Sequence, residues 1–291
     1  MLTPEHLHAL HNLPLAARMA AEGLLHGAHL SRRKGAGMEF SQYRPYQPGD
    51  DLRRLDWRLA ARSDRYYLRE SEVDTSLTVH LVLDATASMN HRDDNGLSKL
   101  EYGRLLCAAL AYVATQQGDA VALTVLHPGG LRHLPPRADA HQLPRLYHAL
   151  ETTDAAGQFP DTATLAPLTA RRQPALTICV TDWYEENGEV ERLLTRLRAA
   201  AGEVLVLHLM ARNELEFTFR GAVTFEDLET GQQLQLDAGQ QRRAWQQQLQ
   251  PWLQATARRA RTLGFDYQLL NTADPFTDAL REFLRRRARG A

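Results

Sequence analysis

The sequence has few cysteines and no long apolar run. Its 291 residues include two cysteines, Cys107 and Cys179, and both lie in apolar stretches. This placement is typical of reduced core residues in a cytosolic protein. No stretch reaches the roughly 18 apolar residues that a transmembrane helix requires, and histidines interrupt the N-terminal region where a secretory signal would be apolar. We therefore expect a cytoplasmic protein without a transmembrane segment.

An excess of charge of either sign is also absent. The 34 lysines and arginines nearly balance the 35 aspartates and glutamates, and the formal net charge is −1. This balance gives no general reason to expect nucleic acid or an anionic membrane as a partner. Hydrophobic residues make up 44% of the chain and charged residues 24%, which is ordinary for a globular protein. The length suits one large domain or two small ones.

A run rich in valine and leucine, residues 77–83, has the pattern of a strand that is buried on both faces of a parallel sheet. The run ends in a carboxylate and two hydroxyls at alternate positions, Asp84, Thr86 and Ser88. Open α/β sheets place their ligands at the carboxyl ends of such strands. One acid and two alcohols suit a hard cation such as Mg²⁺. The alternative is that these side chains cap the following turn through backbone amides.

A second carboxylate, Asp182, follows another apolar strand, residues 175–180. The carboxyl ends of parallel strands meet at one edge of a sheet, so Asp84 and Asp182 are expected on the same rim. Asp182 could instead cap the helix that we expect near residues 189–201. Taken together, the two strand ends favour a genuine cation site.

The rest of the chain alternates between helical and strand patterns. We expect helices over residues 13–26, 99–117, 140–150, 238–263 and 275–287, and strands over residues 120–126, 131–134, 203–210 and 266–270. Pro251 is expected to kink or split the longest helix. The predicted fold class is therefore α/β, a mostly parallel sheet with helices on both faces. We place a helix and an arm in residues 1–75, packed on a main domain of residues 76–291.

The arm, residues 38–62, interleaves acids and arginines with leucines and a tryptophan. Pro48, Gly49, Asp50 and Asp51 form a turn pattern. Planar arginine side chains pair well with carboxylates. We therefore interpret the arm as a partly buried network of arginines and aspartates that pins an extended segment to the main domain. A surface that docks a partner is the alternative, and the two are compatible.

The arm resembles the hallmark of the bacterial domain-of-unknown-function family fifty-eight. That hallmark is a Glu-Phe pair, then Arg-x-Tyr-x-Pro-Gly-Asp-Asp, Arg-x-x-Asp-Trp and a later Ala-Arg. The matching residues are Glu39, Phe40, Arg44, Tyr46, Pro48, Gly49, Asp50, Asp51, Arg53, Asp56, Trp57, Ala61 and Arg62. The resemblance continues through residues 83–89 and 99–102. It implies a von Willebrand factor A-like domain that is typically encoded beside a MoxR-type AAA+ ATPase.

The Asp-x-Thr-x-Ser stretch is similar to the Asp-x-Ser-x-Ser metal-ion-dependent adhesion site (MIDAS) of von Willebrand factor A domains, with Thr86 in place of the first serine. In such domains a threonine from a later loop completes the site. Thr162 and Thr164 are the candidates here, although their surroundings depart from the usual Gly-Thr-Asp form. The resemblance also implies that Asp182 acts through water and keeps the cation electrophilic toward an outside acid. The implied cofactor is Mg²⁺, with Mn²⁺ or Ca²⁺ as alternatives.

Two classes of function follow. The first is a non-catalytic, divalent-cation-dependent interaction module that binds an acidic residue of a client protein or of a MoxR-type ATPase and assists assembly or maturation. The second is a metal-dependent phosphohydrolase, because a strand ending in Asp84 resembles the start of haloacid dehalogenases. Those enzymes carry an acid/base aspartate two positions later, and Thr86 stands there instead. We therefore predict the interaction module, with no catalytic residues.

Overall fold

Two compact units make up the chain, Ser31–Ser76 in one and Met1–Leu30 with Leu77–Ala291 in the other. The computed structural model describes residues 3–25, 40–45, 66–71, 77–128, 130–160, 175–184, 188–277, 281–283 and 285. In the smaller unit, strands β1 (Phe40–Pro45) and β2 (Tyr67–Ser71) pair antiparallel.

Most of the arm motif falls outside the described residues. Arg44 lies in β1, where its backbone pairs with Leu68 of β2. The other motif residues named as structural or partner-binding candidates lie outside, namely Glu39, Tyr46, Pro48, Gly49, Asp50, Asp51, Arg53, Asp56, Trp57 and Arg62. The packing of the arm on the main domain therefore stays a prediction.

The N-terminal helices belong to the larger unit rather than to the arm with which we grouped them. Helix α1 (Pro4–His8) and helix α2 (Leu13–Leu25) precede the division at residue 30. Buried Ala17 and Ala21 of α2 belong to the same apolar core as the sheet. This packing explains why α1 and α2 belong to the larger unit, although residues 31–76 separate them from the first central strand.

The larger unit is built on a six-stranded sheet with the order β10-β7-β6-β3-β4-β5. Its strands are β3 (Thr78–Asp84), β4 (Ala120–His127), β5 (Gly130–Arg137), β6 (Ala175–Thr181), β7 (Gly202–Met210) and β10 (Asp266–Asn271). All neighbouring pairs are parallel except β4 and β5. The predicted α/β class and mostly parallel sheet are confirmed.

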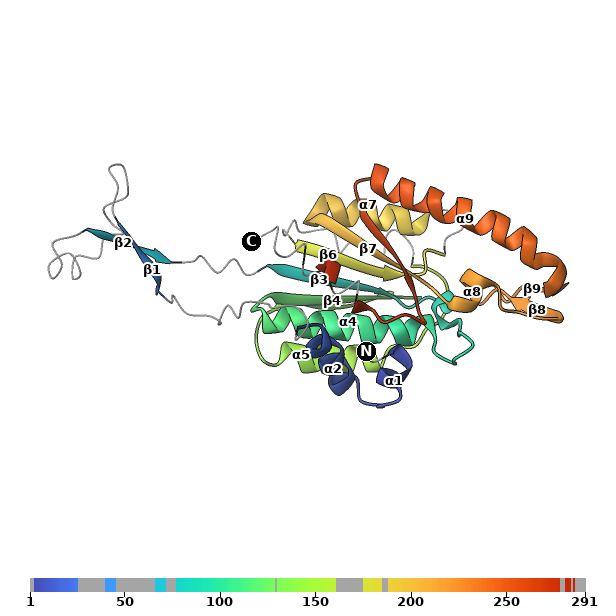
Figure 1. The fold of residues 1–291 in the computed structure, drawn as a ribbon, viewed down its shortest axis with the longest axis horizontal. Helices are drawn as coiled ribbons and strands as arrows, with labels where there is room; N and C mark the ends of the chain where they lie inside the picture. Colours follow the sequence, from blue (N-terminus) through green and yellow to red (C-terminus); the bar gives the residue numbers. More distant parts are fainter. Residues whose placement is uncertain are drawn as a thin grey trace. The chain divides into compact units, whose positions relative to one another are not determined.

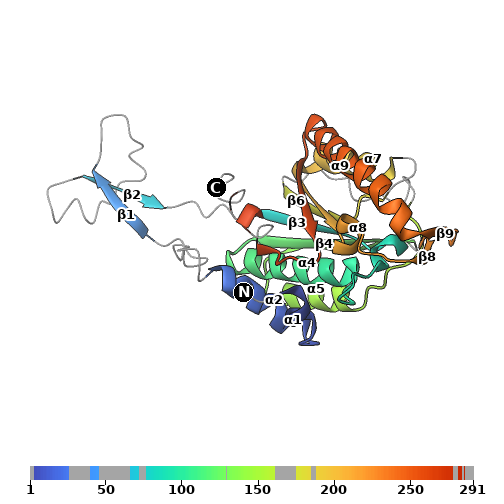
Figure 2. The ribbon, with the colours of Figure 1, turned by 45° about the vertical axis from the view of Figure 1, so that its right-hand side comes forward.

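Helices cover both faces of this sheet (Figures 1 and 2). Helix α4 (Lys99–Gln116) and helix α5 (Gln142–Glu151) lie on one face, together with α1 and α2. Helix α7 (Glu189–Ala201) and helix α9 (Ala238–Thr262) lie on the other. Helix α9 continues through Pro251 as a single helix, so the predicted split does not occur. No helix among the described residues is apolar over a length sufficient to cross a bilayer.

Two small elements lie near the carboxyl ends of the parallel strands. Helix α8 (Arg212–Glu216) follows β7, and strands β8 (Ala222–Glu226) and β9 (Gln233–Asp237) form a separate antiparallel hairpin. Both views place the hairpin at the end of the unit where the loop after β3 lies (Figures 1 and 2). Buried Asp93 of that loop accepts the backbone amide of Asn213 at 3.1 Å, which holds α8 there.

Gly103 on α4 sets how closely this helix approaches the sheet. A Cβ atom at Gly103 would meet Leu83 at 3.0 Å, Val180 at 3.5 Å and Leu209 at 3.6 Å. Gly103→Val overpacks this layer, so we expect a loss of about 1–3 kcal/mol in the free energy of unfolding. Urea unfolding measures the loss, with exposed Gln116→Val at the end of the same helix as control. Equal stabilities for the two variants would contradict this view of the packing.

Candidate functional site

Asp84 ends β3 as a buried carboxylate, 1% exposed. Both of its oxygens accept hydrogen bonds from the protein. The Thr86 amide donates to Oδ1 at 3.0 Å, and the Thr181 hydroxyl donates to Oδ2 at 2.7 Å. Thr181 is the last residue of β6 and in turn accepts the Trp183 amide at 3.0 Å. These bonds fix the carboxylate between the two central strands.

The two hydroxyls of the predicted cluster lie together beside Asp84. Thr86 Oγ1 and Ser88 Oγ are 3.1 Å apart. Thr86 precedes the 3₁₀ turn Ala87–Asn90, but its side chain caps no amide of that turn. The Ser88 hydroxyl lies close enough to Asp182 to help lower the pKa of that carboxyl group. The structure thus brings the four residues predicted at the two strand ends onto one rim of the sheet, and the Thr86 hydroxyl belongs to the cluster rather than to a cap.

A buried lysine pairs with the second carboxylate. Lys99, the first residue of α4, is 4% exposed, and its Nζ donates to Asp182 Oδ2 at 2.7 Å. The same ammonium group donates to Glu214 Oε1 at 3.1 Å. Glu214 lies on α8, and its other oxygen accepts the Ala211 amide at 2.7 Å. This role of Lys99 was not predicted, because the sequence places a lysine at the start of an apolar helix but does not show which way its side chain turns.

The charges at this rim act on one another strongly because they are buried. Burial raises the pKa of Asp84 to about 6, and the neighbouring Asp182 adds to this shift. Burial alone would also raise the pKa of Asp182, but Lys99 outweighs it, and the pKa of Asp182 is lowered. Burial alone would lower the pKa of Lys99, yet Asp182 and Glu214 together raise it. Lys99 therefore compensates Asp182, and no cationic side chain among the described residues pairs with Asp84.

A further carboxyl group reaches the site from the turn of the β8–β9 hairpin. The Ser88 hydroxyl lies close enough to Glu229 to act against the rise in the pKa of that carboxyl group, and Glu229 Oε1 is a buried atom without a hydrogen-bond partner among the described residues. Burial raises the pKa of Glu229 to about 7, with Asp182 and Asp84 contributing next. The Glu229-Thr230-Gly231 stretch has the pattern of a hairpin turn, but the sequence carries no signal of what this turn faces.

Comparison with known proteins places the chain in a family. The family model described as "Protein of unknown function DUF58" matches residues 42–252. This chain belongs to that family. The predicted membership in the family is confirmed.

Individual relatives of this DUF58 protein are distant. The uncharacterized protein Rv1480 of Mycobacterium tuberculosis (strain H37Rv) is 27% identical over 235 residues, which cover 78% of this chain and 72% of the relative. BatB from Bacteroides thetaiotaomicron superposes with a TM-score of 0.47 at 15% identity, over 74% of this chain and 100% of BatB. The SpRpn10 VWA domain gives 0.38 at 11% identity, over 72% of this chain and 95% of that domain. We therefore infer function from the site itself.

The donor set of this DUF58 protein fits a hard divalent cation. Its side chains offer carboxylate and hydroxyl oxygens, the ligands that Mg²⁺ takes in proteins. The orphaned Glu229 oxygen and the uncompensated Asp84 show an excess of negative charge at one place. Within the described part of the chain, no three acidic, histidine or cysteine side chains are grouped closely enough to hold a metal. Hydroxyl groups would therefore have to share the coordination.

The loop expected to complete the site passes beside it. Ala156 donates its amide to the Ala85 carbonyl at 3.1 Å, and the Gly157 carbonyl accepts the Ala87 amide at 2.8 Å. Gly157 has φ +62°, and a Cβ atom there would lie 2.5 Å from Pro128, so only glycine fits this close approach. The candidate ligands that follow, Thr162 and Thr164, lie outside the described residues.

A cavity of about 940 Å³ opens next to Lys99 and Asp182. It lies between the carboxyl ends of the strands and α9, and most of its other lining side chains are apolar or aromatic. These include Trp183, Leu209, Met210, Trp245, Leu249 and Trp252. Trp245 and Trp252 are 38% and 44% exposed. The rim therefore adjoins an open, largely apolar surface.

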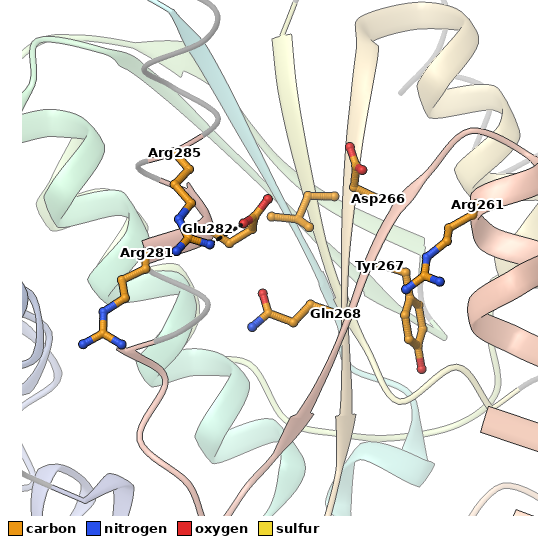
Figure 3. Close-up of a pocket in the computed structure, with 8 residues that line it drawn as sticks. Arg261, Asp266, Tyr267, Gln268, Arg281, Glu282 and Arg285 are labelled. Atoms are coloured by element: carbon orange, nitrogen blue, oxygen red, sulfur yellow. Dashed lines mark ion pairs between the residues drawn. The ribbon is translucent and has the colours of Figure 1, made fainter. Parts of the chain in front are cut away.

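A second cavity, of about 430 Å³, lies at the opposite ends of the strands (Figure 3). It is lined by Arg261, Arg281 and Arg285 together with acidic residues, and Arg285 pairs with Glu282 at 3.8 Å. Asp266, at the amino end of β10, also lines it. Because Asp84 and Asp182 lie at the carboxyl ends, this cavity is separate from the candidate site.

Proposed function

We propose that this DUF58 protein is a non-catalytic, divalent-cation-dependent interaction module. In this proposal it acts with a MoxR-type AAA+ ATPase in the assembly or maturation of a client protein. The observation that supports it is the buried cluster of Asp84, Thr86, Ser88 and Asp182, whose oxygens gather on one rim. A cluster of this composition holds a cation with few protein charges, so the cation retains affinity for an acidic side chain from a partner.

The residues of the site have separate roles in this proposal. Asp84 supplies the fixed negative charge, because its two hydrogen bonds prevent it from turning away. Lys99 keeps Asp182 charged and in place. Mg²⁺, when bound, would supply a positive centre for an incoming carboxylate. The adjoining apolar cavity offers room for the residues that flank the acid. The MoxR-type partner rests on the family resemblance.

The phosphohydrolase alternative is less well supported by the same geometry. Each oxygen of Asp84 accepts one hydrogen bond and keeps a further lone pair, so these bonds allow either a nucleophile or a cation ligand. The acid/base position is taken by Thr86, whose hydroxyl pairs with Ser88. Hydrolysis of p-nitrophenyl phosphate provides the test. Turnover that requires Mg²⁺ and disappears in Asp84→Asn would favour the enzyme over the interaction module.

The main test is capture of the MoxR-type ATPase of the same organism by the full chain. We expect capture in Mg²⁺ and its loss in EDTA. We also expect Asp84→Asn to weaken capture by at least about tenfold, because the site loses the charge that holds the cation. Asp139→Asn is the matched control, since it makes the same change at an exposed position between β5 and α5. Circular dichroism checks that both variants fold.

Two results would overturn the proposal. One is undiminished capture by folded Asp84→Asn, and the other is wild-type capture that is indifferent to EDTA. Either would mean that the rim is a structural feature and that another surface carries the interaction. Residues 31–76 are the first surface to test in that case, because the arm motif lies there.

A further inference from the structure

The turn of the β8–β9 hairpin directs an acidic side chain at the candidate cation site. Glu229 contributes one carboxyl oxygen that is buried and has no hydrogen-bond partner in the described part of the chain. Ser88, a predicted cation ligand, lies close enough to this side chain to act on its carboxyl group. An acid that served only to close the turn would be expected to pair both oxygens or expose them to water. The unpaired oxygen therefore indicates that Glu229 binds a group that is not part of the turn.

The turn is built to hold Glu229 in this position. Asp227 organises it, because its Oδ1 accepts the Glu229 amide at 2.9 Å and its Oδ2 accepts the Thr230 hydroxyl at 2.8 Å. Gly231 donates its amide to the Asp227 carbonyl at 2.7 Å and has φ +74°. The geometry of Glu229 is thus set by its neighbours in the turn and does not depend on a cation.

A tyrosine connects this turn to the strand end that carries Asp182. The Tyr184 hydroxyl donates to Asp227 Oδ2 at 3.0 Å, and the Tyr184 amide donates to Asp182 Oδ1 at 3.3 Å. The strands β8 and β9 pair with each other and form a sheet of their own. A hairpin of two strands is marginal in stability by itself. The turn can therefore be displaced without breaking the six-stranded sheet.

We propose that Glu229 is an internal acidic ligand of the cation site beside Asp84, Thr86 and Ser88, while Asp182 stays paired with Lys99 and acts through water. Glu229 is held where the acidic side chain of a partner must bind. This inference rests on the proposed function. A tethered acid competes at a high effective concentration, in the millimolar range for a short connection. A weakly binding free carboxylate therefore does not displace it, whereas a partner that also contacts the neighbouring surface does. Displacement of the hairpin turn is the conformational change that accompanies partner binding.

The test measures cation binding directly. Isothermal titration with Mn²⁺ compares the full wild-type chain with Glu229→Gln, and we expect affinity to fall by about tenfold because an anionic ligand is lost. Glu226→Gln is the matched control, since Glu226 is an exposed acid on β8 of the same hairpin. It should change the affinity by less than about twofold. Hydrogen exchange of amides 227–232 should slow on Mg²⁺ addition in the wild type and not in Glu229→Gln.

The outcomes separate this inference from the proposed function. Mn²⁺ binding that requires Asp84 but is equal in wild type and Glu229→Gln would overturn the internal ligand and leave the cation site standing. The same conclusion would follow if Mg²⁺ did not change the hydrogen exchange of amides 227–232 in the wild type. If the wild type binds no Mn²⁺, or if Asp84→Asn binds it equally well, then the cation site fails and Glu229 has no ligand role.

Discussion

Replacing Lys99 with methionine is expected to lower the free energy of unfolding by about 3–5 kcal/mol. Its ammonium group donates to Asp182 at 2.7 Å and to Glu214 at 3.1 Å. The side chains of Lys99 and Asp182 are 5% and 2% exposed, so water cannot replace the lost partner. Methionine preserves most of the side-chain length but leaves Asp182 as an uncompensated buried charge.

Urea unfolding in EDTA measures this loss, because EDTA prevents a divalent cation from taking the place of the ammonium group. Arg92→Met is the control. Arg92 pairs with Glu101 at 3.0 Å, but its side chain is 53% exposed, so its loss should cost less than about 1 kcal/mol. Adding Asp182→Asn to Lys99→Met should recover part of the stability, since the unpaired ion is then gone. A loss of under about 1 kcal/mol in Lys99→Met would show that Asp182 is compensated by another group.

The rim of the sheet was predictable because its signals are local. A buried parallel strand has a continuous apolar run, and Asp84 follows one such run directly while Asp182 follows another. Right-handed crossovers then place both strand ends on one edge. Thr86 and Ser88 needed no further information, since they follow Asp84 within four positions. The structure brings all four together, as their spacing indicated.

The partners of these residues could not be predicted in the same way. Lys99 and Asp182 are 83 positions apart in the sequence, and nothing near Lys99 shows that its side chain turns into the rim. Glu229 lies in a turn that the sequence does indicate, but the direction of a turn depends on how its hairpin packs. For Lys99 and Glu229 the deciding contacts are long-range. Helix α9 shows a different limit, because Pro251 predicts a kink or a split and the helix continues through it without a split.

The compensation of Asp182 by Lys99 has a consequence for Asp84, which remains buried without a matched cation. Its folded pKa is raised to about 6, whereas an unfolded aspartate titrates near 3.9. Between these values the folded state binds more protons than the unfolded state, so its stability falls as the pH rises. The full shift corresponds to about 3 kcal/mol, which is retained below roughly pH 4 and lost above roughly pH 6.

Asp84→Asn removes this titration. We expect the variant to match the wild type near pH 4 and to exceed it by about 1–3 kcal/mol at pH 7 in EDTA. Urea unfolding at intervals from pH 4 to pH 8 measures the difference. Mg²⁺ at 10 mM should reduce this difference in the free energy of unfolding, because it stabilises the wild type by about 1.4 kcal/mol if the dissociation constant is on the order of 1 mM.

Exposed Asp139→Asn is the control for a change of one surface charge, and it should stay within about 0.5 kcal/mol of the wild type at every pH. A gap between Asp84→Asn and the wild type that does not vary with pH would contradict the raised pKa. A gap of the opposite sign would mean that the hydrogen bonds from Thr86 and Thr181 stabilise the ionised carboxylate by more than burial and Asp182 destabilise it. Asp84 would then stay ionised in the folded protein without a bound cation, and the raised pKa would no longer support a cation site at this rim.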